Sequence, residues 1–264
     1  MNKRTLNNYL GIGILAAFLL MTIGFLVVFL VRMFYKGLPV LSLNFIFRNP
    51  REAMTAGGIF PAVAGTFWLT SLAILVAFPL GVLTAIYLSQ YGKPRWLVRT
   101  VKVAINTLAG TPSIIFGLFG MAVFVNLMGF DVSLLSGSLT LAILAMPMII
   151  NATEEAIRGV PSDFSEASLA LGATKRQTIM KVVLPTALPS ILTGTIISIG
   201  RVAGETAPIM FTAATFYSRR LPHNITDEVM ALPYHIYALM TEGTKPEAQV
   251  PIAYGTALVL LLMV

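Results

Sequence analysis

Two unlike charges occur four residues apart inside an apolar stretch, RVAGETAPIMFTA (201–213). Residues at this spacing share a helix face, so Arg201 and Glu205 are expected to interact. A charge in the middle of a membrane costs about 2.5–3.5 kcal/mol, and such residues usually face a bundle interior or a water path. The guanidinium fork of Arg201 suits an oxyanion, with Glu205 competing to release it and Thr206 adding a hydroxyl donor. The alternative is a structural ion pair that fixes helix packing.

Two hydroxyl residues flank a proline in another apolar stretch. Thr111 and Ser113 lie on either side of Pro112 in LAGTPSIIFGLFG (108–120). A proline kinks a helix and frees a carbonyl, and hydroxyl groups at the kink can donate to a passing anion. Such hydroxyl groups more often bond to a carbonyl one turn earlier. Thr111 and Ser113 are therefore candidate pathway residues beside a purely structural role.

Acidic residues end the fourth apolar stretch. Arg158 follows Glu154 by four residues, and this spacing predicts a local ion pair, with a role in a gate as the second interpretation. Glu154, Glu155 and Asp163 form a weak acidic cluster, which is the feature that favours an alternative function, a membrane-embedded transferase. The sequence contains neither HExxH nor GxSxG, the motifs of two large enzyme classes.

Composition disfavours several other kinds of chemistry. Without cysteine, the chain offers no disulfide, thiolate catalyst or cysteine metal site. His223 and His235 are isolated from other ligand residues, so we expect surface histidines and no metal site. No GxxxxGK[ST] occurs, so the chain is expected to bind neither ATP nor its Mg²⁺. The net charge of +7 is more typical of a membrane topology signal than of nucleic-acid binding.

Membrane-spanning helices must position these residues. The chain is 56% hydrophobic and 11% charged, whereas a soluble domain has roughly 25% charged residues. A spanning helix needs about 20 mostly apolar residues. Six candidate spans cover residues 9–31, 62–87, 105–128, 138–151, 189–213 and 252–264. The first is too long for a signal peptide and is expected to be retained. The last is either tilted and incomplete or short of a natural tail.

The distribution of cations favours a cytoplasmic N-terminus. In that orientation ten Lys and Arg residues lie in inner segments and seven in outer ones, Arg219 and Arg220 among the latter. Cations close to the ends of spans are retained preferentially on the cytoplasmic side. The loop of residues 152–185 is then cytoplasmic, and the segments 34–59 and 216–247 face outward.

The stretch EASLALGATKRQTIMKVVLP (166–185) interrupts the apolar segments with charges. Ser162 is predicted to cap a short helix, and Gly172 suits the left-handed position that ends it. Thr174 and Gln177 have the spacing of a capping box, which starts a second helix. Pro185 is predicted to end that helix. The sequence therefore predicts a helix, a tight turn and a helix between two spans.

Two cations begin the second of these helices. Lys175 and Arg176 lie where the helix dipole disfavours positive charge by about 0.3–1 kcal/mol each. Their position is explained if they contact either lipid phosphates at the inner surface or an acidic partner protein. The residues themselves leave both interpretations open.

The same stretch resembles the EAA loop of the membrane subunits of ATP-binding-cassette importers. That pattern is E-A-A, three residues, G, nine residues, I, one residue, L-P. The matching positions here are Glu166, Ala167, Ser168, Gly172, Val182, Leu184 and Pro185, with Ser168 and Val182 as conservative departures. Residues 108–120, 152–174 and 201–213 together resemble the A-type permease subunit of phosphate-specific (Pst) importers.

This resemblance implies a fold and a set of partners. The fold is the all-α, six-span transmembrane domain of type I importers in a prokaryotic plasma (inner) membrane. The N-terminal part (1–59) would hold the cytoplasmic end, the first span and an outer loop, and residues 60–264 the permease domain with its coupling loop at about 152–185. Expected partners are a homologous C-type permease subunit, two copies of a cytoplasmic ATPase and an external phosphate-binding protein.

The resemblance also assigns residues to roles. Coupling to the ATPase, which binds ATP and Mg²⁺, would use Glu166, Ala167, Ser168, Gly172, Lys175 and Arg176. A permease for another oxyanion, such as sulfate, molybdate or phosphonate, is the alternative function.

Overall fold

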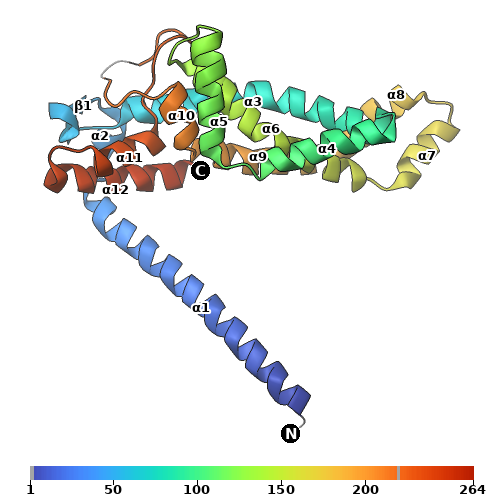
Figure 1. Cartoon of the computed structure of the whole chain (residues 1–264), viewed down its shortest axis with the longest axis horizontal. Helices are drawn as coiled ribbons and strands as arrows, with labels where there is room; N and C mark the ends of the chain where they lie inside the picture. The colour runs from blue at the N-terminus through green and yellow to red at the C-terminus, as the bar shows by residue number, and fades with distance from the viewer. Residues whose placement is uncertain (1–2, 219–220) are drawn as a thin grey trace.

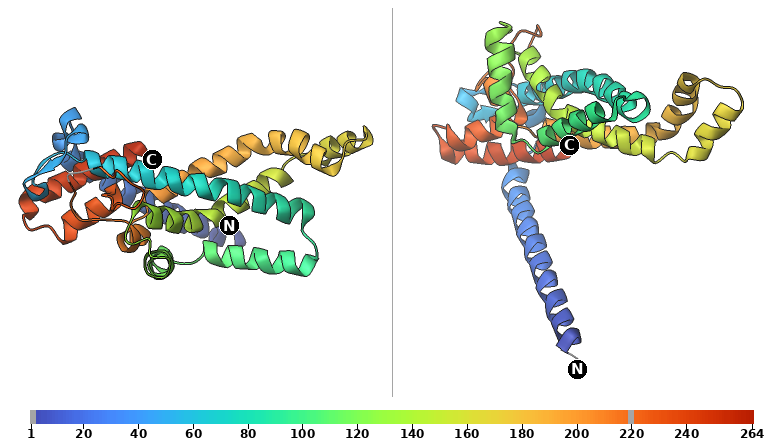
Figure 2. Two further views of the ribbon diagram at one scale, coloured as in Figure 1. Left: turned by 90° about the horizontal axis from the view of Figure 1, so that it is seen from above. Right: turned by 45° about the vertical axis from the view of Figure 1, so that its right-hand side comes forward.

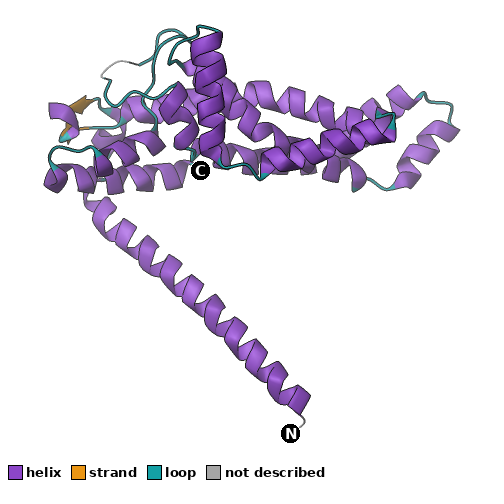
Figure 3. Cartoon of the chain, in the orientation of Figure 1, coloured by secondary structure: helices purple, strands orange, loops and turns teal. Residues whose placement is uncertain are grey.

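The apolar stretches of the sequence form long helices that pack side by side in the computed structural model (Figure 1). The structure describes residues 3–218 and 221–264, so Arg219 and Arg220 lie outside the described residues. Within the described residues the only sheet is a small antiparallel pair, β1 (Pro50–Arg51) and β2 (Ala56–Gly57) (Figure 3). The predicted all-α class is confirmed.

Five helical segments of the described chain are long and apolar enough to cross a membrane. They contain α1 (Lys3–Gly37), α3 (Phe60–Ile86), α6 (Leu134–Arg158), α9 (Leu184–Ala203) and α12 (Pro246–Met263). A sixth span results if the bent pair α4 (Arg95–Ala109) and α5 (Ser113–Gly120) is counted as one. The expected number of about six spans agrees with this count.

The third predicted span is not one continuous helix. α4 and α5 meet at an angle of 101°, and a π-helical segment, η4 (Met121–Leu127), continues α5. Gly110 and Pro112 lie in the break: proline lacks the N–H of a helical bond and disfavours the helical conformation of the residue before it. The helix predicted over 105–128, with a kink at Pro112, is therefore divided into two helices.

The fifth predicted span is displaced and broken. A continuous helical path runs from α8 (Lys175–Thr178) through the π-helical η5 (Ile179–Val183) into α9, so Pro185 does not end the helix. Pro185 comes directly after the π-helical η5, and such a local adjustment lets a membrane helix continue through a proline. The path ends at Gly204, and the short helix α10 (Ala207–Thr212) follows.

Two other predicted spans were too short. α6 begins after Ser133, whose hydroxyl accepts from the Ser136 N–H, and it extends to Arg158. α12 begins at Pro246 and has 18 residues. The predictions were too short because they counted only apolar residues, whereas both helices continue into polar residues at their ends.

The core lies where α3, α6 and α9 pack together. Small residues allow the close approach: a Cβ added at Gly81 would come within 2.8 Å of Ile149, and one at Gly194 within 2.4 Å of Ala152. The largest buried cluster includes Leu69, Ala73, Ala77, Leu141, Ala145, Ile149 and Val202. This packing fixes α6 and α9 relative to each other.

The two ends of the bundle carry different structures (Figures 1 and 2). α7 (Ser162–Ala170) and α8 form one end, beside the π-helical η3 (Tyr87–Tyr91) that continues α3. The opposite end holds the sheet, the 3₁₀ helices η1 (Leu38–Val40) and η2 (Glu52–Met54), α2 (Leu43–Phe47) and α11 (Leu232–Thr241). The loop of residues 152–185 is thus remote from segments 34–59 and 216–247.

The first helix projects away from the bundle (Figure 2). None of its most apolar window is buried within the chain, and it packs against α12 near Gly37. Its exposed apolar side chains include Leu15, Phe18, Leu19 and Phe25. Such a surface is stable when it contacts lipid or other apolar helices.

Candidate functional site: the coupling loop and a polar stripe

The loop between α6 and η5 folds as a helix, a turn and a helix, as predicted. Gly172 has a φ of +86°, the left-handed geometry expected at this position. The side chain of Thr174 accepts from the Gln177 N–H, and Gln177 accepts from the Thr174 N–H, which completes the capping box. Ser162 is not the cap of α7, because Pro161 precedes the helix and Ser162 is its first residue.

A hydroxyl contact joins the two helices of this loop. The hydroxyl oxygens of Ser168 and Thr178 lie 3.0 Å apart, and Thr178 is buried. Ser168 is the position at which the sequence departs from the alanine of the family pattern. An alanine would lack this hydrogen bond, so the serine fixes α7 against α8 instead of extending to a partner.

The outer surface of the loop is open to a partner. Glu166, Ala167, Gly172 and Arg176 are exposed. Apolar side chains accompany them: 89% of Leu171 is exposed, together with half of Phe164 and of Leu169. Sequence reasoning missed these three residues, although an apolar residue directly before a turn glycine in a charged loop is an available signal. Exposed apolar side chains that gather beside charged residues are typical of a protein–protein interaction surface.

Lys175 makes contacts within its own chain. Its ammonium group donates to the Gln90 carbonyl and lies 5.0 Å from the centre of the Tyr91 ring. This contact within the chain is a third explanation for the position of the cation, beside lipid phosphate and an acidic partner protein. It links the loop to η3, at the end of α3. Arg176 remains exposed beside it.

The Arg201–Glu205 pair forms at the point where α9 ends. Arg201 Nε lies 3.5 Å from Glu205 Oε1, and Arg201 Nη1 lies 3.5 Å from Met148 Sδ on α6. The cation is in the last turn of α9, where the helix dipole favours it. The Arg201 side chain is 43% exposed and that of Glu205 is 14% exposed. Most of the guanidinium donors therefore remain available to a ligand.

The other predicted pathway residues are not joined to this pair. Thr111 donates to the Thr107 carbonyl at 2.9 Å, which is the structural role weighed above. Ser113 begins α5, and Thr206 precedes α10 without a side-chain cap. Among the described residues, no hydrogen bond or ion pair links Thr111 or Ser113 to Arg201. The helix breaks at 110–112 and 204–206 nevertheless lie in neighbouring parts of the fold, because α5 packs on α10.

A second charged cluster lies between α4 and α6. The predicted pair is present, with Arg158 Nη2 at 3.4 Å from Glu154 Oε2. Lys102 Nζ lies closer to the same oxygen, at 2.7 Å. The sequence did not predict this contact, because 52 residues separate the partners and only tertiary packing brings them together.

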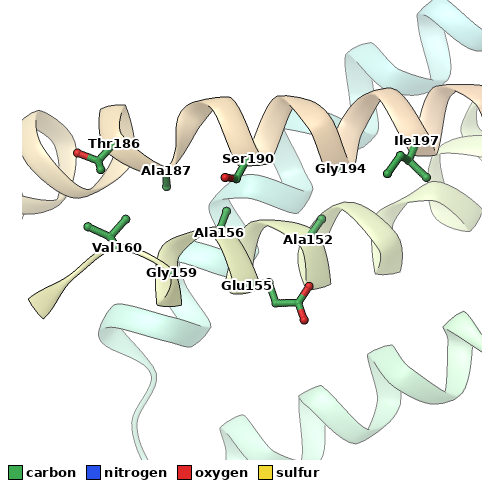
Figure 4. A pocket seen from close by; sticks show the side chains of 10 residues that line it. All are labelled: Ala152, Glu155, Ala156, Gly159, Val160, Thr186, Ala187, Ser190, Gly194 and Ile197. Carbon is green, nitrogen blue, oxygen red and sulfur yellow. The ribbon is translucent and has the colours of Figure 1, made fainter.

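A groove lies between α6 and α9 (Figure 4). Its volume is about 440 Å³, and small residues such as Ala152, Ala156 and Ser190 line it. Glu155 borders the groove but extends its carboxylate away from α9 (Figure 4). The groove itself therefore offers little charge for binding an ion.

The two histidines lie in different environments. His223 is exposed, as expected, and its backbone N–H donates to Asp227 Oδ2 at 2.8 Å. His235 is buried, so the expectation of a surface residue was wrong, and burial lowers its pKa to about 4. Hydrogen bonds from Asn224 and His223 lower the pKa of Asp227. No group of three or more potential ligand residues gathers into a metal site in the part of the chain that the structure describes.

An all-helical bundle with a broken helix pair, an arginine in the last turn of an apolar helix and an exposed two-helix loop is typical of the membrane component of a transport system. The family model "binding-protein-dependent transport system inner membrane component" matches residues 77–264. The chain therefore belongs to this family, a family of multi-pass inner-membrane permease subunits.

Individual relatives agree with this assignment. The chain is 35% identical over 240 residues to the probable ABC transporter permease protein YqgI of Bacillus subtilis, covering 87% of this chain and 81% of that protein. It is 40% identical over 211 residues to the phosphate transport system permease protein PstA of Mycobacterium leprae, covering 79% and 67%. A solved bacterial ABC transporter involved in alginate import matches in fold, with a TM-score of 0.65 and 18% identity over 98% of this chain and 95% of that one.

Proposed function

We propose that this chain is the membrane-spanning permease subunit of an ATP-driven importer of inorganic phosphate. The observation that carries the proposal is the exposed coupling loop, folded around Gly172, on a chain that shares 40% identity with a phosphate permease. Arg201 supports the choice of an anion, because its exposed guanidinium donors can bind oxyanion oxygens in pairs. The chain itself acts as a transport subunit without catalysis.

Partner proteins supply the energy for transport and the other half of the translocation pathway. The sequence has no phosphate-binding loop, so ATP and Mg²⁺ belong to two copies of a cytoplasmic ATPase that docks on the coupling loop. Arg201 lies on an open side of this chain, which a homologous C-type permease subunit closes. An external phosphate-binding protein delivers the ion. No nucleic acid takes part.

Transport of labelled phosphate into proteoliposomes that contain the assembled complex tests this function. We expect uptake to require ATP and the binding protein, and to be unaffected by an excess of sulfate, molybdate or phosphonate. Competition by one of these anions would favour the alternative oxyanion permease. Turnover by the purified chain without the ATPase would instead indicate the transferase.

The orientation that we propose places the N-terminus and the coupling loop in the cytoplasm. The loop-charge bias supports it, as does the position of residues 152–185 at the end of the bundle opposite to 216–247. Because the chain has no cysteine, single cysteines report without background. In intact cells an impermeant thiol reagent should label Asn224→Cys and spare Ser162→Cys. The reverse pattern would overturn the orientation.

A further inference from the structure

Lys175 joins the coupling loop to the end of a helix that the loop does not directly continue. α7 and α8 pack on each other and on η5, which leads into α9. The ammonium group of Lys175 donates to the carbonyl of Gln90 in η3, and it lies 5.0 Å from the centre of the Tyr91 ring. Because η3 continues α3, a side chain of α8 is bound to a second span.

The two ends of this contact account for the position of the cation. Lys175 is the first residue of α8, where the helix dipole disfavours a positive charge, and the capping box of Thr174 and Gln177 holds the backbone there. Gln90 lies in the last turn of the helical path Phe60–Tyr91. Carbonyl groups in a last turn lack donors within the helix, and the dipole there favours a cation. The unfavourable position in α8 is thus offset at the end of η3.

An apolar contact lies next to this polar one. Ile179 and Val183 of η5 belong to the same buried cluster as Ile86 of α3. Lys175 precedes Ile179 by four residues, so its contact with η3 lies one helical turn further along, on the coupling loop itself. Two contacts one turn apart restrict the rotation of α8 against α3 more than the apolar contact alone.

α3 connects this end of the bundle with a candidate pathway residue. The helical path Phe60–Tyr91 has 32 residues, which corresponds to roughly 48 Å at 1.5 Å per residue. Toward its other end, Thr66 and Thr70 line the same small cavity as Glu205. The Thr66 hydroxyl also accepts from the Leu232 N–H at 2.8 Å, at the start of α11. A displacement of α3 would therefore reach both Glu205 and α11.

We propose that Lys175 is a positioning residue that makes α3 follow the coupling loop when the ATPase moves the loop. The proposal rests on the proposed function, since it gives one residue a role in coupling ATP hydrolysis to phosphate import. Contiguous contacts between rigid elements can carry such coupling over a distance. Without Lys175 the loop still docks through its exposed surface, but only the apolar residues of η5 pass its movement to α3.

The ratio of ATP hydrolysed to phosphate transported tests this role in proteoliposomes that contain the assembled complex. Lys175→Met should raise the ratio about threefold to fivefold, the effect of losing one exposed cation–π contact with its hydrogen bond. Recovery of the ATPase with the tagged permease should not change. Lys175→Arg keeps a donor that also stacks on rings, so its ratio should stay near that of the unmodified complex.

A neighbouring cation supplies the matched control. Lys93 is exposed two residues after Tyr91 and has no ion pair or ring contact among the described residues. Lys93→Met removes the same charge from the same end of the bundle and should leave the ratio unchanged. An equal rise in Lys93→Met and Lys175→Met would overturn the proposal, because the effect would then depend on charge alone.

A double-variant cycle tests whether Lys175 acts through its contact with η3. Tyr91→Leu removes the ring and should raise the ratio by itself, which also provides a second variant if Lys175→Met does not assemble. Combining Lys175→Met with Tyr91→Leu should give no further rise beyond Lys175→Met, since both substitutions break one contact. Effects that multiply would show that Lys175 acts elsewhere.

Acylation of the lysine amine tests the contact apart from transport. The unmodified complex and Tyr91→Leu are treated with an acetylating N-hydroxysuccinimide ester, and the peptides that hold Lys175 and Lys93 are quantified by mass spectrometry. Loss of the ring should speed modification of Lys175 about threefold and leave that of Lys93 unchanged. An unchanged rate at Lys175 would overturn the contact.

The remaining outcomes separate this role from the proposed function. An unchanged ratio in Lys175→Met removes the coupling role while the importer stands. Loss of ATPase recovery in Lys175→Met would make Lys175 a docking residue instead. If the unmodified complex takes up no phosphate, the proposed function fails, and the acylation result decides the contact with α3 by itself.

Discussion

Arg201→Gln should lower phosphate uptake per assembled complex about 30-fold, because the anion would lose a charged donor and a hydrogen bond to a charged group contributes about 2 kcal/mol. Arg201→Lys keeps the charge but loses the planar fork, so uptake should fall sharply but less than in Arg201→Gln. Glu205→Gln should mainly alter release, because the anion loses its competitor for Arg201. Uptake of labelled phosphate, normalised to the amount of complex, measures all three.

The charge-swapped double variant separates a ligand from a structural pair. Arg201→Glu with Glu205→Arg preserves the ion pair but moves the guanidinium group from the last turn of α9 to the segment beyond its end. If Arg201 contacts the anion, complex yield should recover while uptake should not. Full recovery of uptake would show that the pair only fixes helix packing.

Leu171→Asp should abolish stable docking of the ATPase, which is the second large effect that we expect. Leu171 is 89% exposed at the tip of the coupling loop, and burying a leucine side chain at an interface contributes about 1.5–3 kcal/mol. An aspartate would lose this contribution and would also have to be desolvated. Recovery of the ATPase with the tagged permease in detergent should therefore fall at least about tenfold.

Neighbouring residues provide matched controls for docking. Arg176→Met removes an exposed cation from the same surface and should weaken recovery of the ATPase. Lys175→Met should change recovery little, because the Lys175 ammonium is bound to Gln90 and Tyr91 of its own chain. Equal loss in Lys175→Met and Arg176→Met would refute the distinction drawn from the structure.

Local sequence signals determined much of the fold. Long apolar stretches predicted the spans, because the cost of unpaired backbone groups in lipid leaves helices as the solution for each segment. The turn at Gly172 and the capping box at Thr174 were also predictable, since both depend on residues within one or two turns. The Glu154–Arg158 pair follows from helix spacing alone.

Other features of the fold could not be predicted from local sequence. The bend of 101° between α4 and α5 and the π-helical passage before Pro185 depend on how neighbouring helices satisfy freed backbone groups. The burial of His235 was missed because the residue was judged by its type, although the stretch around it, ALPYHIYALM (231–240), is apolar. Proline thus marked candidate breaks, while packing selected which of them became real.

Part of the candidate site was also predictable from local sequence, and part was not. The sequence alone identified Arg201, Glu205 and the coupling loop, because charges in apolar stretches and glycine turns stand out from their neighbours. Only the tertiary structure placed Lys102 against Glu154, turned Lys175 back onto Gln90 and aligned Met148 with Arg201. These contacts join residues from different helices, and their formation depends on the relative depth and rotation of those helices. The packing of small residues between helices sets this depth and rotation, and the periodicity of a single helix does not predict either.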